Sequence, residues 1–310
     1  MTFEQHLQAK GHSKATCQAY TFQLLDHLTW LDKEGLEAEA VTTRDLTSWL
    51  HYLQQKGQVN STRRNALIAV RHFYDWQIQR GQREDNPADP IKIRGAGGRK
   101  LYPILSKEEL ETMYHRYDLA EETDARANRN WFQQYRLSRQ RNKVMLGLMI
   151  YQGLLTSEVN DLMLQDLKLK EGTVFIAGGR TSNERTLDLK PQQIIEMMEY
   201  LLQTRKELIQ QESSNDQLLF LPATPYNKMQ TATNALNVWK RLSQDVAAQH
   251  PRFINFLQVR TSVITHWLKQ YNLREVQYKA GHRYVSTTEG YLINQMEDLQ
   301  SDIDEFHPIG

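Results

Sequence analysis

Three kinds of residue near the C-terminal end of the chain could act together on a phosphate group. The run from Tyr278 to Tyr291 reads YKAGHRYVSTTEGY and places His282, in a glycine-histidine turn, nine residues before Tyr291 (291 − 282). A histidine donates or accepts a proton near neutral pH, and a phenol oxygen can serve as a nucleophile. Arg260, followed by Thr261-Ser262 on a predicted helix, would supply a cation for the same anion.

Each of these residues, taken alone, has a simpler explanation. A single tyrosine such as Tyr291 is usually a half-buried packing residue, and a single histidine is usually a satisfied surface or core residue. The combination of Arg260 with the spacing between His282 and Tyr291 favours the catalytic interpretation.

The N-terminal hundred residues are predicted to form helices joined by short turns. Ser13 can cap a helix whose apolar residues recur at spacings of three and four, and Asn60 or Ser61 begins a later helix. The prolines of residues 86–90 (NPADP) stop the helices, and the run 92–100 (KIRGAGGRK) indicates a basic linker.

The remainder of the chain is predicted to be mostly helical with one small sheet. Ser106 and Glu109 form a capping box at its start. Two short strands, 173–176 and 185–189, flank the turn-forming run GGRTSN and predict an antiparallel hairpin. Helices are expected at residues 138–153, 191–211, 230–248, 259–271, 273–280 and 286–292, followed by a tail helix.

The composition suits a two-domain protein that is not embedded in a membrane. The chain has 310 residues, 40% of them apolar, and no apolar run approaches the length of a membrane span. Its start does not resemble a signal peptide, and Cys17 is the only cysteine, so we expect a reducing, cytoplasmic location. The formal net charge of +1 gives no argument for nucleic acid, so the distribution of the charges matters more.

Nearly the whole chain resembles the tyrosine recombinases, also called phage integrases. In the N-terminal part the resemblance is carried by three short runs: Ser13-Lys14-Ala15-Thr16, Ser61-Thr62 with Arg71-His72-Phe73-Tyr74, and Asn86-Pro87-Ala88. In the C-terminal part it is carried by Arg260, Gly281-His282 and Tyr291.

The resemblance implies a mainly α fold. Its N-terminal helical core-binding (SAM-like) domain would span residues 1–91, and a basic linker would span residues 92–105. A mostly helical catalytic domain with a small antiparallel sheet would span residues 106–310.

The resemblance also assigns roles to four residues. Tyr291 matches the nucleophile of the family, Arg260 its second arginine and His282 its later histidine, while Arg180 aligns with the lysine of the hairpin. Arg180 can bind a phosphate but is a poor general acid because it stays protonated. His282, Lys279 or water would then supply a proton to the leaving hydroxyl.

Two further positions depart from the family and favour a divergent branch associated with mobile elements and transposition. Leu155 stands where the first arginine is expected, and Leu257 where a histidine is expected. Losing one donor from a phosphate clamp typically costs about 10²–10³ in rate, so Leu155 predicts slower chemistry unless another cation compensates. The candidate substitutes are Arg136, Arg139 and Arg141, although each is more simply interpreted as a solvated residue of a helix.

The resemblance implies a site-specific recombinase or integrase that cuts and rejoins double-stranded DNA through a phosphotyrosine on Tyr291. No metal or other cofactor is expected, since the phosphotyrosine retains the bond energy, and protomers would assemble on DNA as a homo-tetramer. Basic residues that could contact DNA, if they are not ordinary solvated charges, are Arg63, Arg64, Arg71, Lys92, Arg94, Arg99 and Lys100. The alternatives are a catalytically impaired relative that occupies recombination sites without cutting, and a type IB topoisomerase.

Overall fold

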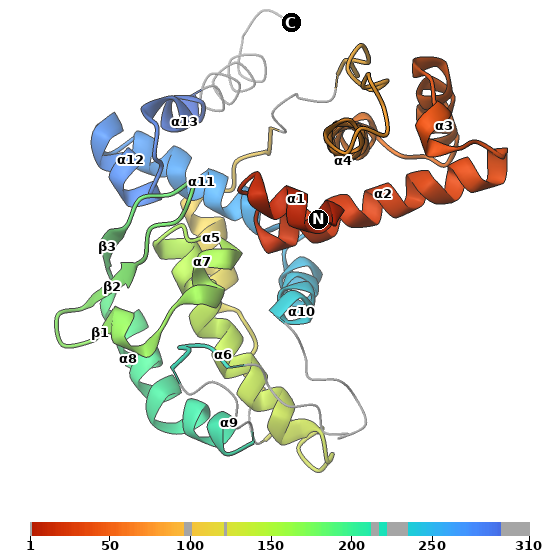
Figure 1. The fold of residues 1–310 in the computed structure, drawn as a ribbon. Helices are drawn as coiled ribbons and strands as arrows, with labels where there is room; N and C mark the ends of the chain where they lie inside the picture. Colours follow the sequence, from red (N-terminus) through yellow and green to blue (C-terminus); the bar gives the residue numbers. More distant parts are fainter. Residues whose placement is uncertain (1, 96–100, 121–122, 212–216, 222–234, 293–310) are drawn as a thin grey trace, which may run out of the picture. The chain divides into compact units, whose positions relative to one another are not determined.

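The fold comes from a computed structural model, which describes residues 2–95, 101–120, 123–211, 217–221 and 235–292 (Figure 1). The chain divides into two compact units, Met1–Lys100 and Leu101–Gly310. Each unit has its own hydrophobic core, as is usual for domains. Within the described ranges, no helix is both long and apolar enough to cross a membrane.

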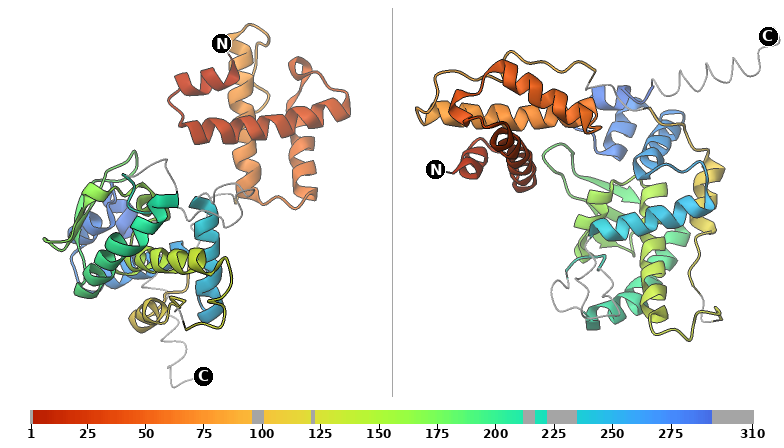
Figure 2. Two further views of the ribbon diagram at one scale, coloured as in Figure 1. Left: turned by 90° about the horizontal axis from the view of Figure 1, so that it is seen from below. Right: turned by 90° about the vertical axis from the view of Figure 1, so that its right-hand side faces the viewer.

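The first unit is a bundle of helices. They are α1 (Phe3–Ala9), α2 (Lys14–Glu34), α3 (Thr43–Gln55) and α4 (Asn60–Gln79), with a 3-10 turn η1 (Ala38–Ala40) between α2 and α3. Helix α2 packs mainly against α4, and the two helices cross (Figure 2). The predicted cap is confirmed, because the Ser13 hydroxyl accepts a hydrogen bond from the Thr16 amide at 3.2 Å.

Large apolar side chains from α3 and α4 fill the centre of this bundle. Leu46, Trp49 and Leu53 lie on one face of α3 and are fully buried, and Tyr74 of α4 is fully buried beside them. Burial of each such side chain contributes about 1.5–3 kcal/mol. These contacts make the mainly helical first unit a compact domain.

The second unit is mostly helical, as predicted. Its helices are α5 (Lys107–His115), α6 (Phe132–Tyr151), α7 (Thr156–Asp161), η2 (Leu164–Asp166), α8 (Pro191–Glu199), the π-helical η3 (Tyr200–Thr204), α9 (Arg205–Gln211), α10 (Ala235–Gln249), α11 (Phe256–Leu268), α12 (Leu273–Ala280) and α13 (Val285–Glu289). The continuous helix predicted at 191–211 therefore contains a π-helical segment. The predicted tail helix lies outside the described residues.

A small antiparallel sheet completes the second unit, which confirms the predicted fold class. Strand β2 (Thr173–Ile176) pairs with β3 (Arg185–Asp188), and Ile176 lies opposite Arg185. The predicted hairpin is thus confirmed. Strand β1 (Leu167–Lys168) adds a third strand on the other side of β2 and was not predicted, because a two-residue strand has no readable alternation.

Helix α6 runs through the core of the second unit and determines where the surrounding elements lie. Every residue from 141 to 150 is buried, and α5, α8 and α11 pack against the helix. The loop that follows α6 leads directly into α7, while α11 and α12 bring the C-terminal part of the chain beside β3 (Figure 1). This packing brings together the segments that the sequence analysis singled out.

Candidate active site

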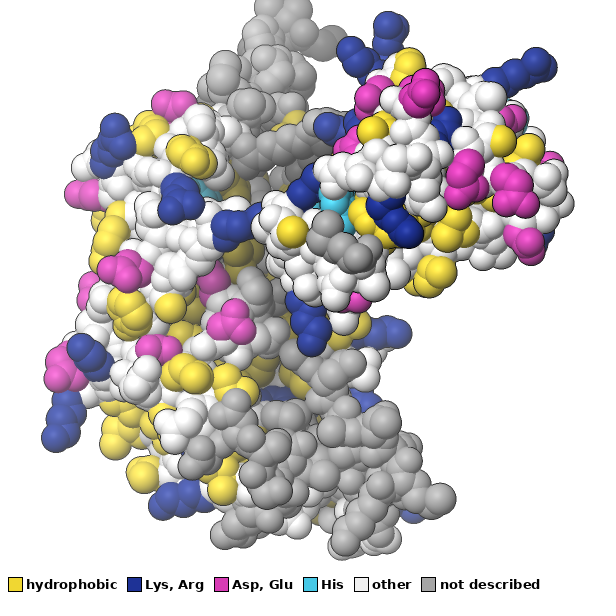
Figure 3. Space-filling view, in the orientation of Figure 1, with side chains coloured by type: hydrophobic (Ala, Val, Ile, Leu, Met, Phe, Trp, Pro, Cys, Tyr) yellow, Lys and Arg dark blue, Asp and Glu magenta, His cyan; other side chains and the backbone are white. Residues whose placement is uncertain are grey.

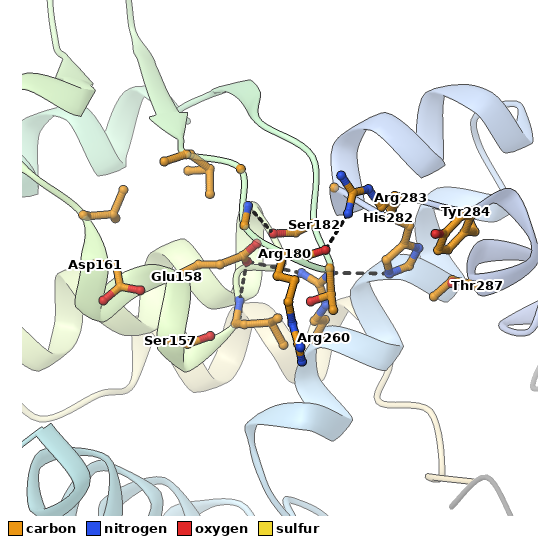
Figure 4. Close-up of a pocket in the computed structure, with 18 of the residues that line it drawn as sticks. Ser157, Glu158, Asp161, Arg180, Ser182, Arg260, His282, Arg283, Tyr284 and Thr287 are labelled. Atoms are coloured by element: carbon orange, nitrogen blue, oxygen red, sulfur yellow. Dashed lines mark hydrogen bonds and ion pairs between the residues drawn. The ribbon is translucent and has the colours of Figure 1, made fainter. Parts of the chain in front are cut away.

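An open cleft of about 770 Å³ in the second unit gathers side chains from four segments of the chain (Figure 4). These segments are residues 155–166 (α7 and η2), which contribute Glu158, Asp161 and Asp166, the β2–β3 hairpin, helix α11, and the region from the α12–α13 turn onward. Arg180, Arg260 and Arg283 line the cleft together with His282 and Tyr291. The structure therefore brings together all four residues for which the sequence predicted a catalytic role, and adds a further arginine.

Arg260 is buried on α11, with 4% of its surface exposed. Its guanidinium donates to the carbonyl oxygens of Gly153 and Ala280, and its Nη1 lies 3.6 Å from Oε2 of Glu158. Burial lowers the pKa of Arg260, whereas Glu158 and Tyr291 act in the opposite direction. An arginine nevertheless remains protonated in proteins, so Arg260 is a fixed cation in the wall of the cleft.

The contacts of His282 indicate which ring nitrogen carries the proton. Its Nε2 lies 3.4 Å from Nη2 of Arg260, and its Nδ1 lies 2.9 Å from the hydroxyl oxygen of Thr288. Because a guanidinium can only donate hydrogen bonds, Nε2 must be the accepting nitrogen. In the neutral tautomer the proton would therefore be on Nδ1, and the lone pair of Nε2 would face the guanidinium of Arg260.

Tyr291 follows α13 and packs directly against the histidine. The ring centroids of Tyr291 and His282 are 5.5 Å apart, with an angle of 13° between the ring planes. The phenol raises the pKa of Arg260, which indicates that the two groups are close, and 8% of the tyrosine is exposed. A phenol, an imidazole and a guanidinium thus meet in one cleft.

A buried ion pair beside Arg260 was missed by the sequence analysis. Glu158 of α7 accepts two hydrogen bonds from Arg185 of β3, with Nη1–Oε1 at 2.8 Å and Nη2–Oε2 at 2.9 Å. Burial alone would raise the pKa of Glu158, but the hydrogen bonds and charge of Arg185, followed by the charge of Arg260, lower it overall. The sequence contained one signal that Arg185 is buried: it lies two residues before Leu187, on the same inward face of β3.

The two leucines that depart from the family pattern also line the cleft. Leu155 is half-buried immediately before α7, and its amide donates to Oε2 of Glu158 at 2.8 Å. Leu257 is 47% exposed one turn before Arg260 on α11. Apolar side chains therefore occupy two places on the wall where the resemblance led us to expect a cation and an imidazole.

The prediction that Arg136, Arg139 or Arg141 replaces the missing first arginine is wrong, because none of them lines the cleft. Nη1 of Arg139 forms an ion pair with Asp245 at 2.6 Å, and its Nη2 lies 3.8 Å from Asp118. Arg141 is buried and donates to the carbonyl oxygen of Leu221 at 2.8 Å. Neither residue lines the cleft, because α6 directs both side chains into other contacts within the unit. The third candidate, Arg136, is half-buried on the same helix and does not line the cleft either.

Lys279 is also placed away from the cleft. Its ammonium group lies over the rings of Tyr271 and Trp267, at 4.8 and 5.8 Å from their centroids. These cation–π contacts hold it on a different face of α12. Lys279 is therefore excluded as a proton donor in this arrangement, and His282 and water remain.

Two exposed arginines lie at the rim of the cleft, one on the hairpin loop and one on the α12–α13 turn. Arg180 lies in the loop between β2 and β3, and its carbonyl oxygen accepts a hydrogen bond from Nη1 of Arg283 at 2.6 Å (Figure 4). The loop is also held to the histidine turn, since the amide of Asn183 donates to the carbonyl oxygen of Gly281 at 2.9 Å. Arg283 was not predicted, although it directly follows His282 in the sequence.

The basic residues predicted to contact DNA fall into three groups. Arg63 donates to Gln54 and Asn60 side chains, and Arg71 donates to the carbonyl oxygens of Ala88 and Ile91, so both also serve contacts within the first unit. The exposed members are Arg64, Lys92 and Arg94. Arg99 and Lys100 lie outside the described residues. On the face drawn in Figure 3, the Lys and Arg side chains are interspersed with Asp and Glu.

Comparisons with known proteins agree with the fold and identify the family. Residues 1–81 match the phage integrase N-terminal SAM-like domain, and residues 105–298 match the phage integrase family. The chain therefore belongs to the tyrosine recombinase (phage integrase) family.

Its relatives are similar over nearly the full length of both chains. Tyrosine recombinase XerD of Haemophilus influenzae is 25% identical over 308 residues, covering 97% of this chain and 94% of the relative. Tyrosine recombinase XerC of Oceanobacillus iheyensis is 24% identical over 312 residues, covering 99% of this chain and 95% of the relative. At this identity the family is secure, whereas individual site residues must be argued from the structure.

Solved structures share the fold. The XerH site-specific recombinase bound to a palindromic difH substrate, in a post-cleavage complex, aligns with a TM-score of 0.67 and 20% identity over 96% of this chain and 82% of that chain. A lambda integrase tetramer bound to a Holliday junction aligns with a TM-score of 0.60 and 14% identity over 93% and 74%. The Tn1549 transposon integrase in complex with circular intermediate DNA aligns with a TM-score of 0.59 and 16% identity over 94% and 95%.

Proposed function

We propose that this protein is a site-specific DNA recombinase that cuts and rejoins DNA through a covalent bond to Tyr291. The phenol oxygen attacks a backbone phosphorus, the new O–P bond forms, and the P–O bond to one deoxyribose breaks. The phenol proton passes to a base or to water, and the departing sugar oxygen takes up a proton. Rejoining is the same exchange in reverse, so the phosphate bond energy is retained throughout.

One observation carries this proposal: Tyr291 stacks on His282 beside Arg260 in a single cleft. The phenol has an unperturbed pKa of about 10, so attack requires removal of its proton or stabilisation of the developing charge. Nε2 of His282 has the lone pair for the first task, and Arg260 has the fixed charge for the second. Arg180 and Arg283 provide further positive charge at the rim.

Double-stranded DNA is the substrate that this chemistry implies. Exposed Arg64, Lys92 and Arg94 would contribute phosphate contacts, and binding would therefore weaken steeply as salt is raised. Because recombination needs paired cleavages, we propose that protomers assemble as a tetramer on DNA. The lambda integrase tetramer bound to a Holliday junction supports this assembly by analogy. The departures at Leu155 and Leu257 support a divergent recombinase of the mobile-element type.

The test of the proposal is a covalent adduct. The sites that the protein occupies on genomic DNA are mapped first, and a mapped site is then placed in a nicked suicide duplex, which traps the protein after cleavage. Wild-type protein should yield the adduct and Tyr291→Phe should yield none. Tyr284→Phe is the matched control, because Tyr284 is the other tyrosine lining the cleft and should not be needed. An adduct that persists in Tyr291→Phe would refute the nucleophile assignment.

A second function is favoured by a specific feature of the cleft. Leu155 and Leu257 place apolar side chains in its wall, as expected of a relative that occupies recombination sites without cutting them. Such a protein would bind the mapped site with high affinity but form no adduct. Relaxation of supercoiled DNA without sequence preference would instead indicate a type IB topoisomerase.

A further inference from the structure

The buried side chains behind the cleft carry two positive charges and one negative charge. This imbalance determines how much of the charge of Arg260 remains unpaired. Glu158 is the single carboxylate that pairs with both Arg185 and Arg260. We call these three residues the Glu158 cluster. Two arginines and one glutamate leave one positive charge in this group, which is enclosed by protein except where Arg260 and Glu158 meet the cleft.

The geometry shows which arginine the carboxylate neutralises. Arg185 binds Glu158 through both nitrogens of its fork, at 2.8 and 2.9 Å, and its side chain has no exposed surface. Arg260 approaches one oxygen of the same carboxylate at 3.6 Å, beyond hydrogen-bonding distance. A bidentate charge-assisted pair is much stronger than a single longer contact. Glu158 is thus committed to Arg185, and the remaining positive charge resides on Arg260.

The other partners of Arg260 fix its position without cancelling its charge. They are the carbonyl oxygens of Gly153 and Ala280 and Nε2 of His282, none of which carries a negative charge. Removal of Arg185 would leave Glu158 with Arg260 as its only arginine among these residues. The carboxylate would then pair with Arg260 and neutralise the cation in the wall of the cleft.

Arg185 also contacts the turn that carries His282. The guanidinium occupies the space where the Cβ of a side chain at Gly281 would lie, and Gly281 has a φ of +68°. Glycine is therefore required here both by its backbone conformation and by this close packing. One buried side chain of the hairpin thus touches Glu158 of α7 and the turn preceding the nucleophile.

We infer that Arg185 is a positioning residue, which binds Glu158 so that the charge of Arg260 remains available to the scissile phosphate. This inference deepens the proposed function and rests on it for the identity of the anion. Arg185 itself does not reach the cleft and would not touch DNA. The missing first arginine makes the role more important, since Leu155 stands at that position and Arg260 is the one of the two expected clamp arginines that is present.

The inference is tested by restoring the charge balance in a double variant. Arg185→Met should lower the first-order rate of adduct formation by about 10²-fold, because it removes an anion-stabilising charge. Glu158→Gln combined with Arg185→Met again leaves one net positive charge, now on Arg260 alone, and should recover at least about tenfold of that loss. Glu158→Gln alone should slow cleavage less than Arg185→Met does, although it leaves two buried arginines without a carboxylate and should melt at a lower temperature.

A purely structural role for Arg185 predicts a different pattern. In that case the rate would follow the melting temperature across all the variants, and the double variant would be no faster than Arg185→Met. That result would overturn the inference, as would a wild-type rate in Arg185→Met. If Arg185→Met does not fold, the double variant decides alone: it should cleave within about tenfold of wild type, and a well-folded but inactive double variant would refute the inference.

A second readout separates this inference from the proposed function. Binding of inorganic phosphate is measured by calorimetry at low ionic strength, with Arg260→Gln as the control that should abolish it. Wild type and the double variant should bind phosphate, and Arg185→Met should not. If wild type binds phosphate in this pattern but forms no adduct on its mapped site, the recombinase proposal fails while the role of Arg185 stands. Equal binding by Arg185→Met, or no binding by wild type, would refute that role.

Discussion

Two groups of buried arginines in the second unit have opposite charge balances. In the Glu158 cluster two arginines share one carboxylate. In the second group, which we call the Arg139 cluster, Arg139 lies between Asp245 at 2.6 Å and Asp118 at 3.8 Å, with its guanidinium over the ring of Tyr117.

The difference indicates how burial relates to function in this protein. Arg139 has two carboxylates within 4 Å, one of which, Asp118, also lies 3.9 Å from Arg126, and both of its acidic partners remain partly exposed to water, so the group is stable without a ligand. The Glu158 cluster is short of one negative charge and opens onto a cleft. A buried positive charge without a negative partner destabilises the folded protein unless an anion binds beside it. In the proposed reaction, that anion is a DNA phosphate.

The largest expected contrast is between Arg260→Gln and Arg139→Gln. The first removes the excess cation of the cleft and should slow adduct formation by about 10²–10³-fold or more. The second leaves two carboxylates without their arginine and should lower the melting temperature while leaving the adduct rate of the folded protein close to wild type. Both are measured by suicide-duplex cleavage and thermal unfolding. Equal rate losses would mean that the two clusters do not differ in function.

Arg180 gives the next largest effect, because it is exposed and lies at the rim of the cleft. Arg180→Ala should slow cleavage by about 10–10²-fold through loss of one phosphate contact. Arg180→Lys should cleave at least as fast as wild type, since a lysine keeps the charge and can also release a proton, which arginine cannot. A rate for Arg180→Lys as low as that of Arg180→Ala would contradict the proposed contact.

Asp245→Asn tests the charge surplus of the Arg139 cluster by removing one carboxylate. Arg139 would keep Asp118 and the ring of Tyr117, so the stability should fall by only about 1 kcal/mol, with no change in the cleavage rate. Urea unfolding provides the measurement. Asp118→Asn is the matched control and should cost less, because its oxygen lies farther from the guanidinium. A loss of stability as large as that of Arg139→Gln would show that Arg139 needs Asp245 even though Asp118 is nearby.

The smallest expected effect concerns the stability of the folded protein at low pH. The pKa of Glu158 is lower in the folded protein than its ordinary value of 4.5, chiefly because Arg185 outweighs the effect of burial. Its contribution to stability is therefore fully present above pH 4.5 and is lost as the pH falls through the folded-state pKa. The free energy of unfolding of Glu158→Gln should fall less steeply than that of wild type below that pH. If the free energies of unfolding of wild type and Glu158→Gln changed in parallel with pH, the folded protein would not stabilise the ionised form of Glu158.

Local sequence signals predicted much of the fold and the central part of the site. The Ser13 cap, the β2–β3 hairpin and the helix at 273–280 depend on neighbouring residues, and all three agree with the structure. Tyr291, His282 and Arg260 were identified by their spacing and residue types, and the structure places them in one cleft. Their catalytic roles remain predictions.

The sequence failed to predict the roles of residues whose contacts lie in segments far away along the chain. Arg139 and Arg141 were correctly placed on a helix, but α6 is enclosed by protein, so helical periodicity could not tell which side faces the cleft. The pairing of Arg185 with Glu158 joins residues 27 positions apart (185 − 158) across a strand and a helix. No local pattern encodes that contact, and only the inward register of Arg185 hints at it.

The contact between Arg185 and Gly281 constrains the order in which this protein could evolve. The guanidinium fills the volume that any side chain at position 281 would need, so a substitution there is harmful while Arg185 is present. The reverse order is sterically open, because a smaller residue at position 185 leaves the glycine turn intact. Replacing the arginine would remove this clash but would leave the left-handed backbone at position 281, which still favours glycine. The two positions, 96 residues apart (281 − 185), are thus coupled by a single close contact.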